Sequence, residues 1–84
     1  MGCRILLVEA ETISRRKITE LLISEGYSVE EADTGSAALH LLESSNFDVV
    51  VSDLRLLGRI TGADVVDFAA LRNHGVITIG GPHQ

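Results

Sequence analysis

The chain has 84 residues, which is enough for one small domain. Hydrophobic residues make up 45% of it, which argues against disorder. With no Trp, one Tyr and two Phe, the core must consist mainly of Val, Ile, Leu and Ala. The formal net charge of −5 argues against direct binding to nucleic acid or to an anionic membrane.

The cysteine count, the apolar runs and the amino-terminal residues indicate the compartment of the protein. The single cysteine, Cys3, excludes an internal disulfide and fits a reducing compartment. The apolar runs are too short for a membrane span, and the amino-terminal residues do not form a secretory signal. We therefore expect a cytoplasmic protein whose residues 1–84 form one domain, with residues 80–84 as a frayed tail.

The first third of the chain predicts a strand, a helix and a second strand. Residues 3–8 form an apolar run without polar alternation, typical of a strand buried on both faces of a parallel sheet. Residues 12–25 carry apolar side chains at helical spacing, and Gly26 predicts the end of that helix. The apolar positions of this helix are Ile13, Ile18, Leu21 and Leu22. Residues 27–32 alternate weakly and predict an edge strand.

The remaining elements continue the alternation. A second helix is predicted over residues 36–45, with Thr34 or Asp33 as its cap. Residues 47–53 form the most apolar strand, which we expect to be central. A third helix is predicted over residues 63–72, with Val65, Val66, Phe68 and Ala69 on its inner side. The last predicted strand covers residues 76–79.

This βαβαβαβ order predicts an α/β fold with a parallel sheet, right-handed crossovers and helices on both faces. In such sheets the functional crevice lies beyond the carboxyl ends of the strands. Residues 9–11, 53–55 and 80–81 fall at these ends. Asp53 is expected where its strand emerges at this rim, so its charge need not be buried.

Acidic residues at two of these strand ends are the candidate chemical groups. Glu9 and Glu11 follow the first strand, and Asp53 ends the third. If the two strands are neighbours, their tips are roughly 5 Å apart. Two interpretations remain: solvated carboxylates without a special role, or ligands of a hard cation such as Mg²⁺ beside a carboxylate that accepts a phosphoryl group.

Ordered segments of the chain resemble a response-regulator receiver domain, the flavodoxin-like module of two-component signalling. These segments are "ILLVE", "LLISEGYSVEEADTGSAAL", "FDVVVSDLRL" and "GADVVDFAALR". The "DLRLLG" stretch is similar to receivers fused to hybrid histidine kinases. The resemblance covers Arg4 to Ile79. A nucleotide-binding or enzymatic α/β domain is disfavoured because the chain has neither a G-x-G-x-x-G nor a P-loop pattern.

The resemblance implies a CheY-like three-layer αβα fold with strand order 2-1-3-4, and a signalling domain rather than an enzyme. It implies that Asp53 is the phosphoacceptor of a phosphorelay, that Glu9 is the first acidic residue of a Mg²⁺ pocket, and that Arg55 supplies a backbone carbonyl to the metal. It also implies a sensor histidine kinase or phosphotransferase as partner. The helix bearing the basic run Ser14 to Lys17 contributes to such docking in receivers, although a solvated helix face is the more common role of such a run.

Three departures from the receiver pattern predict an impaired pocket. Ala10 occupies the second acidic position, which leaves the adjacent Glu11 as a substitute metal ligand. Gly80 stands where the family has a Ser or Thr that contacts the phosphoryl group and drives the switch. No lysine follows Lys17, so the family's phosphoryl-binding lysine is missing. Mg²⁺ binding is therefore expected to be weak or absent. A degenerate receiver that serves as an interaction module is the alternative function.

The resemblance also implies that the fifth βα unit of the family is missing. The strand over residues 76–79 would then be an exposed edge, and an apolar patch would lie open over the first and third strands. We expect a two-fold homodimer, formed through that edge or through the uncovered sheet face.

Overall fold

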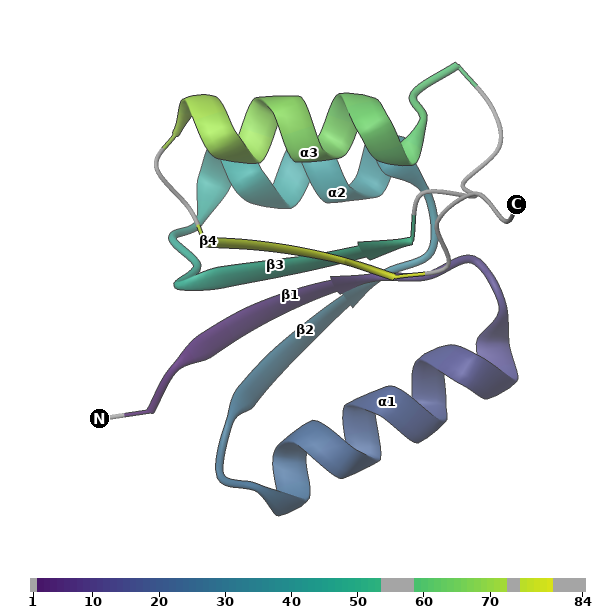
Figure 1. The fold of residues 1–84 in the computed structure, drawn as a ribbon, viewed down its shortest axis with the longest axis vertical. Helices are drawn as coiled ribbons and strands as arrows, with labels where there is room; N and C mark the ends of the chain where they lie inside the picture. The colour runs from purple at the N-terminus through teal and green to yellow at the C-terminus, as the bar shows by residue number, and fades with distance from the viewer. Residues whose placement is uncertain (1, 54–58, 73–74, 80–84) are drawn as a thin grey trace.

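Strands and helices alternate along the described part of the chain, and all of these strands run in the same direction (Figure 1). The computed structural model describes residues 2–53, 59–72 and 75–79. The elements are β1 (Arg4–Val8), α1 (Thr12–Ser24), β2 (Ser28–Ala32), α2 (Gly35–Ser44), β3 (Val49–Asp53), α3 (Gly62–Leu71) and β4 (Gly75–Ile79). Each lies within two residues of its predicted boundaries.

The strands form one parallel sheet in the order β2-β1-β3-β4. The predicted parallel sheet and its strand order 2-1-3-4 are therefore confirmed. β1 and β3 occupy the two central positions, which explains why their sequences are almost continuously apolar: both faces of each strand are covered. β2, with the sequence SVEEA, lies at one edge, as its weaker alternation predicts.

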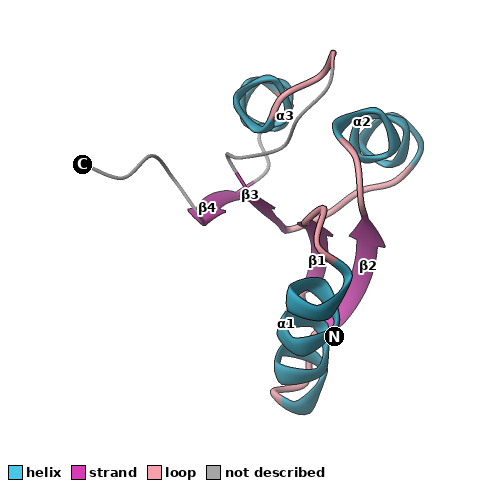
Figure 2. Cartoon of the chain, turned by 90° about the vertical axis from the view of Figure 1, so that its right-hand side faces the viewer, coloured by secondary structure: helices cyan, strands magenta, loops and turns pink. Residues whose placement is uncertain are grey.

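Helices α2 and α3 cover one face of the sheet, and α1 packs on the other (Figure 2). Strand alternation divides the core accordingly. Leu6, Val8 and Val50 point toward α2 and α3, where they join the larger cluster of buried side chains. Ile5, Leu7 and Val51 point to the other face and form a smaller cluster with Ile18 and Leu22 of α1. Among the described residues, no helix is long and apolar enough to cross a membrane.

The smaller cluster corrects two predictions about this face. Ile13 and Leu21 are 67% and 62% exposed, although the sequence pattern included both in the apolar stripe of this helix. The apolar patch expected over the first and third strands is also wrong, because Ile5, Leu7 and Val51 are all buried. α1 lies along β1 and β2, and of its apolar side chains only Ile18 and Leu22 belong to the cluster on this face.

The helix ends follow local sequence signals. At the end of α1, Gly26 has φ of +96°, a left-handed conformation that favours glycine. Its N–H donates to the carbonyl of Ile23, and the N–H of Tyr27 donates to Leu22, which is the Schellman arrangement. The Thr34 hydroxyl accepts from the N–H of Ala37, so Thr34 and not Asp33 caps α2.

The start of α3 is a reciprocal capping box. The Thr61 hydroxyl accepts from the backbone N–H of Asp64 at 3.2 Å, and the Asp64 carboxylate accepts from the backbone N–H of Thr61 at 2.9 Å. The helix therefore begins at Gly62, one residue before the predicted start, because the cap is the threonine itself.

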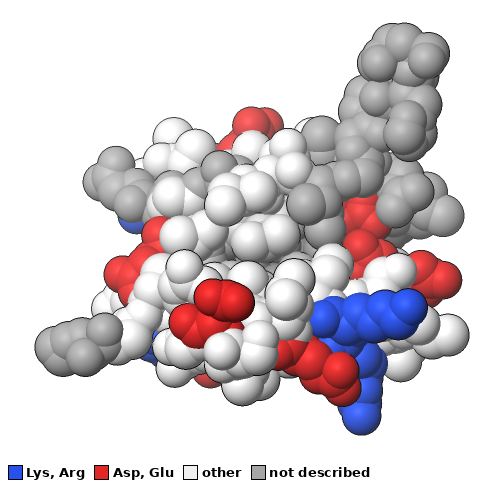
Figure 3. All heavy atoms as spheres, turned by 60° about the horizontal axis from the view of Figure 1, so that its bottom comes forward, with Lys and Arg blue, Asp and Glu red and all other residues white. Residues whose placement is uncertain are grey.

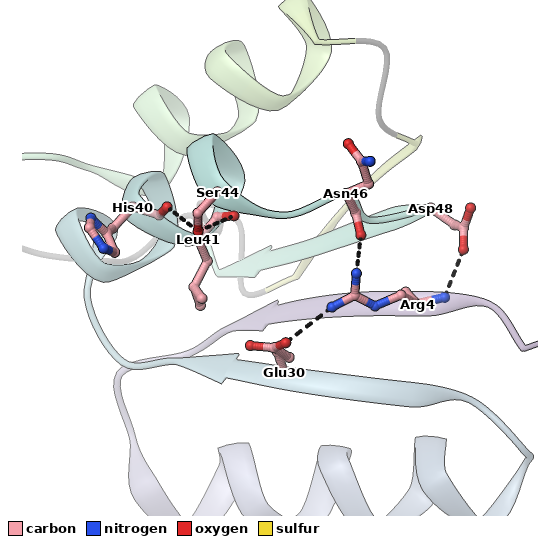
Figure 4. A network of polar contacts seen from close by, with 7 residues as sticks. All are labelled: Arg4, Glu30, His40, Leu41, Ser44, Asn46 and Asp48. Atoms are coloured by element: carbon pink, nitrogen blue, oxygen red, sulfur yellow. Dashed lines mark hydrogen bonds and ion pairs between the residues drawn. The ribbon is translucent and has the colours of Figure 1, made fainter.

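Arg4 ties the amino-terminal end of β1 to its surroundings (Figure 4). Its guanidinium donates to the carbonyl of Asn46 at 2.8 Å and to the Glu30 carboxylate at 3.1 Å, while its backbone N–H donates to the Asp48 carboxylate at 2.7 Å. The guanidinium also lies over the Phe47 ring. These contacts fix the start of β3 against β1, at the opposite end of the sheet from the acidic residues.

Candidate functional site

Glu9 and Asp53 are neighbours at the carboxyl edge of the sheet, the edge that Figure 2 faces. Val8 of β1 pairs with Ser52 of β3, so Glu9, directly after β1, and Asp53, the last residue of β3, lie at the ends of adjacent central strands. Adjacent strands are about 4.8 Å apart. The N–H of Glu9 still donates to the carbonyl of Ala32 in β2, which holds the residue in line with the sheet. The expected meeting of the two strand ends is confirmed by this register.

Both carboxylate residues are buried, each with only 4% of its surface exposed. The expectation that Asp53 lies open at the rim is therefore wrong. Burial of a carboxylate is unfavourable unless partners compensate for the lost water, and a hydrogen-bond donor does so at Glu9: its Oε2 accepts from the backbone N–H of Glu11 at 3.0 Å. Two buried acidic residues side by side set this edge apart from an ordinary solvated strand end.

Glu11 does not join this pair through its side chain. Its Oε1 accepts from the hydroxyl of Ser14 at 2.6 Å, which turns the carboxylate toward the first turn of α1. Glu11 contributes its backbone N–H to Glu9 instead. The sequence shows that Glu11 is close to Glu9, but it does not show that the side chain of Glu11 turns toward α1 while its backbone N–H faces Glu9. Ala10, between the two, is exposed.

The donor set fits a magnesium ion in part. Mg²⁺ binds proteins through one or two carboxylates and keeps several waters, and Glu9 and Asp53 are two such carboxylates. Within the described part of the chain, no group of three or more His, Cys, Asp and Glu side chains is gathered closely enough to hold a metal. Arg55 and Gly80, the other two predicted positions, lie outside the described residues. The register pairs Asp53 with Ile79, the residue before Gly80.

A polar network that sequence reasoning missed supports the loop between β1 and α1. The Arg15 guanidinium donates through Nη1 to the carbonyls of Glu9 at 3.0 Å and Ala10 at 3.4 Å. Its Nε donates to Oε1 of Glu31 in β2 at 3.2 Å. Oε2 of the same carboxylate accepts from the Thr19 hydroxyl at 2.6 Å. The only sequence signal was the basic run Ser14 to Lys17, interpreted as a solvated helix face.

The side chains of the basic run Ser14 to Lys17 differ in exposure. The side chain of Arg15 is only 14% exposed, whereas Arg16 and Lys17 are exposed, as a solvated face requires. The network also lowers the pKa of Glu31, first through the hydrogen bond from Thr19 and then through Arg15, because both favour the ionised carboxylate. Glu31 therefore stays charged and keeps its hold on Arg15.

Ser52 adds a further polar group beneath the site. It is completely buried, and its hydroxyl has no hydrogen-bond partner among the described residues. Alternation along β3 places it on the opposite face from Asp53, among the side chains under α2 and α3.

Comparison with known proteins gives a consistent result. The family model described as the response regulator receiver domain matches residues 5–79. The chain is 41% identical over 64 residues to the chemotaxis protein CheY of Pseudomonas aeruginosa, a match that covers 75% of this chain and 51% of that protein. The chain thus spans about half the length of this curated relative.

Solved structures show the same likeness. A CheY-like receiver domain protein from Methanospirillum hungatei JF-1 superposes with a TM-score of 0.90 at 27% identity, covering 100% of this chain and 68% of that one. The response regulator TrrA of Thermotoga maritima, solved in complex with Mg²⁺ and BeF, gives a TM-score of 0.80 at 32% identity, covering 93% and 66%.

Proposed function

The chain belongs to the response regulator receiver domain family of two-component signalling, and from this premise we propose that Asp53 accepts the phosphoryl group. The observation that carries the proposal is the pair of buried acidic residues, Glu9 and Asp53, which end adjacent central strands at the edge where such folds bind ligands. Asp53 is the member of the pair that terminates the central strand β3, which matches its place in the resemblance.

The chemistry is a transfer from a phosphohistidine. An ionised carboxylate oxygen of Asp53 attacks the phosphorus, so that an O–P bond forms while the P–N bond of the donor breaks. The electron pair of the P–N bond stays on the imidazole, which leaves as a neutral ring when its other nitrogen carries a proton. The product is an acyl phosphate on Asp53. A sensor histidine kinase or a phosphotransferase is the partner in this proposal.

Glu9 and Asp53 are the residues that would hold Mg²⁺ in this pocket. When bound, the ion neutralises charge on the transferring phosphoryl oxygens. Two carboxylates form a smaller donor set than the three acidic positions of the family pattern, because Ala10 offers no side-chain oxygen and Glu11 is turned to Ser14. We infer weaker Mg²⁺ binding, and hence slower phosphorylation, than in a receiver with all three.

Phosphoryl incorporation tests the assignment. The chain is incubated with a small phosphodonor such as phosphoramidate and with Mg²⁺, and its intact mass is measured. We expect one phosphoryl addition, lost in Asp53→Asn. The matched control is Asp33→Asn, because Asp33 is an exposed aspartate that follows β2 at the same edge and should leave the addition unchanged. An addition that persists in Asp53→Asn would assign the acceptor to another residue.

A protein-interaction module without phosphotransfer is the second candidate, and an observation at β4 favours it. This strand lies at the edge of the sheet, its sequence GVITI has no charged residue, and Ile77 is 54% exposed. Natural edge strands are usually protected by charges or bulges. The centre of the face drawn in Figure 3 is occupied mostly by uncharged side chains. We propose that two copies associate here about a two-fold axis.

Location and other partners follow from the same proposal. Phosphotransfer with a histidine kinase places the chain in the cytoplasm. The net charge of −5 argues against nucleic acid as a direct partner, since its phosphates would repel this surface. In this proposal the chain is a signalling domain and not an enzyme that acts on a further substrate.

A further inference from the structure

We propose that Arg15 is a positioning residue for the acidic pocket: it holds the backbone of residues 9–11 so that the Glu9 carboxylate lies beside Asp53. The inference rests on the proposed function, because it concerns the same pocket. The observation that carries it is that one guanidinium contacts two successive carbonyls of this loop and a carboxylate of the neighbouring strand β2.

The geometry connects Arg15 to Glu9 through the backbone. Nη1 of Arg15 can donate hydrogen bonds but cannot accept them. It donates to the carbonyls of Glu9 and Ala10, and these two contacts fix the peptide planes on either side of Ala10. The next N–H along the chain, that of Glu11, donates to Oε2 of Glu9. Rotation of this short loop would break that hydrogen bond and move the carboxylate away from the strand end.

Arg15 is itself held in place. Its Nε faces Oε1 of Glu31, while the other oxygen of that carboxylate accepts from Thr19, one turn further along α1. Glu31 pairs with Leu7 in the sheet, two residues before Glu9. The network therefore joins α1, β2 and the loop at the level of the site.

The charge of Arg15 is already paired with Glu31, so its effect on the pocket is geometric before it is electrostatic. The distinction is testable, because a lysine keeps the charge but has one ammonium group in place of a planar fork. It cannot reach the loop carbonyls and Glu31 from separate nitrogens. We therefore expect Arg15→Lys to resemble Arg15→Met more than the unmodified chain.

The first measurement is the Mg²⁺ concentration that gives half the maximal rate of phosphoryl incorporation from phosphoramidate. Loss of a residue that orients a metal ligand typically costs 10–100-fold in affinity. We expect about a tenfold increase in Arg15→Met, with little recovery in Arg15→Lys. Arg16→Met is the matched control: it removes the same charge from the next position, where the side chain is exposed.

The second measurement needs neither Mg²⁺ nor phosphorylation. Hydrogen exchange of the Glu11 amide reports its bond to Glu9 directly, and we expect it to be about tenfold faster in Arg15→Met than in Arg16→Met. The amide of Val50, in the centre of the sheet, should change equally little in both variants, which separates local loosening from global destabilisation. If Arg15→Met does not fold, Glu31→Gln replaces it, because that change weakens the hold on Nε.

The outcomes separate the two proposals. Faster Glu11 exchange with unchanged Val50 exchange supports the positioning role, whether or not the chain accepts a phosphoryl group. Failure to accept a phosphoryl group would overturn the proposed function alone. Equal Glu11 exchange in Arg15→Met and Arg16→Met would overturn the positioning role. So would full rescue of both measurements by Arg15→Lys, because charge would then be sufficient.

Discussion

Glu31 shows how a single residue in an edge strand comes to support a site that it does not belong to. It receives one hydrogen bond from Thr19 and one from Arg15, and it lies within the field of Arg16 as well. All three favour the ionised carboxylate and together they outweigh the opposing effect of burial, so its pKa lies below the ordinary value of 4.5.

The lowered pKa of Glu31 makes a prediction about pH. A group whose pKa is lower in the folded state contributes stability above its unfolded value, and this contribution is lost as the pH falls through the folded value. The contribution of Glu31 should therefore be complete above about pH 4.5 and decline below it. Replacing Thr19 by Val removes the largest cause of the shift, so the pKa of Glu31 should rise toward 4.5.

A carbon-detected NMR titration of the Glu31 carboxyl measures this change. Thr12→Val is the control, because Thr12 is an exposed threonine in the same helix. An unchanged Glu31 titration in Thr19→Val would show that the hydroxyl is not a significant donor to this carboxylate.

At the scale of the elements, α2 and the segment before α3 approach each other closely, in the layer that the two helices form on one face of the sheet. A Cβ on Gly35, the first residue of α2, would overlap the backbone carbonyl oxygen of Ile60 and lie 2.8 Å from its Cγ2. Gly35 is buried, as is Gly62 at the start of α3. A glycine at this contact lets the amino-terminal ends of both helices lie close together beside the carboxyl edge of the sheet.

Gly35→Ala is therefore predicted to destabilise the fold by about 1–2 kcal/mol. Overpacking costs typically 1–3 kcal/mol, and the better helix propensity of alanine offsets up to about 1 kcal/mol of that. Urea unfolding at equilibrium measures the change. The control is Ser36→Ala at the next, exposed position, which should shift the free energy of unfolding by less than about 0.5 kcal/mol. A Gly35→Ala protein as stable as the control would show that Ile60 can move aside without cost.

At the scale of the whole molecule, the uneven cover of the sheet is the dominant feature. Two helices lie on one face, whereas α1 alone among the described elements lies on the other, beneath β1 and β2 (Figure 2). Ile77 of β4 is paired with the buried Val51 and yet is 54% exposed, because it lies beyond the reach of α1. Leu21, on α1 itself, is also exposed.

If two copies associate through β4, the substitution Ile77→Lys should strongly weaken the dimer. A lysine at an edge strand opposes pairing with a second copy, because two charges would meet across the two-fold axis. Sedimentation equilibrium at micromolar concentration should show a dimer for the unmodified chain and a monomer for Ile77→Lys. Leu71→Lys is the control, since Leu71 is 84% exposed on α3, outside β4. A monomer for the unmodified chain, or equal association of all three proteins, would contradict the proposal.

Much of the architecture can be predicted from the sequence, because the signals that specify it are local. The alternation of apolar runs and helical stripes determines the βαβαβαβ order, and handedness then leaves few topologies. Helix ends are specified within three or four residues, as the Thr34 cap and the Gly26 turn show. The placement of Glu9 and Asp53 at one edge also follows, because each terminates a strand of a parallel sheet.

Properties that depend on distant parts of the chain were decided only by the tertiary structure. A helical stripe shows which residues share a face, but not how wide a surface that face will meet, so the exposure of Ile13 and Leu21 could not be foreseen. The same holds for the burial of Asp53 and for the contact of Arg15 with Glu31, 16 positions away. The sequence by itself determined the order of the elements and the edge that carries the acidic residues, since short-range sterics and periodicity suffice for both. Only the packing of α1 against β2 decided which of those residues are held together, because burial and hydrogen bonding arise between elements and not within them.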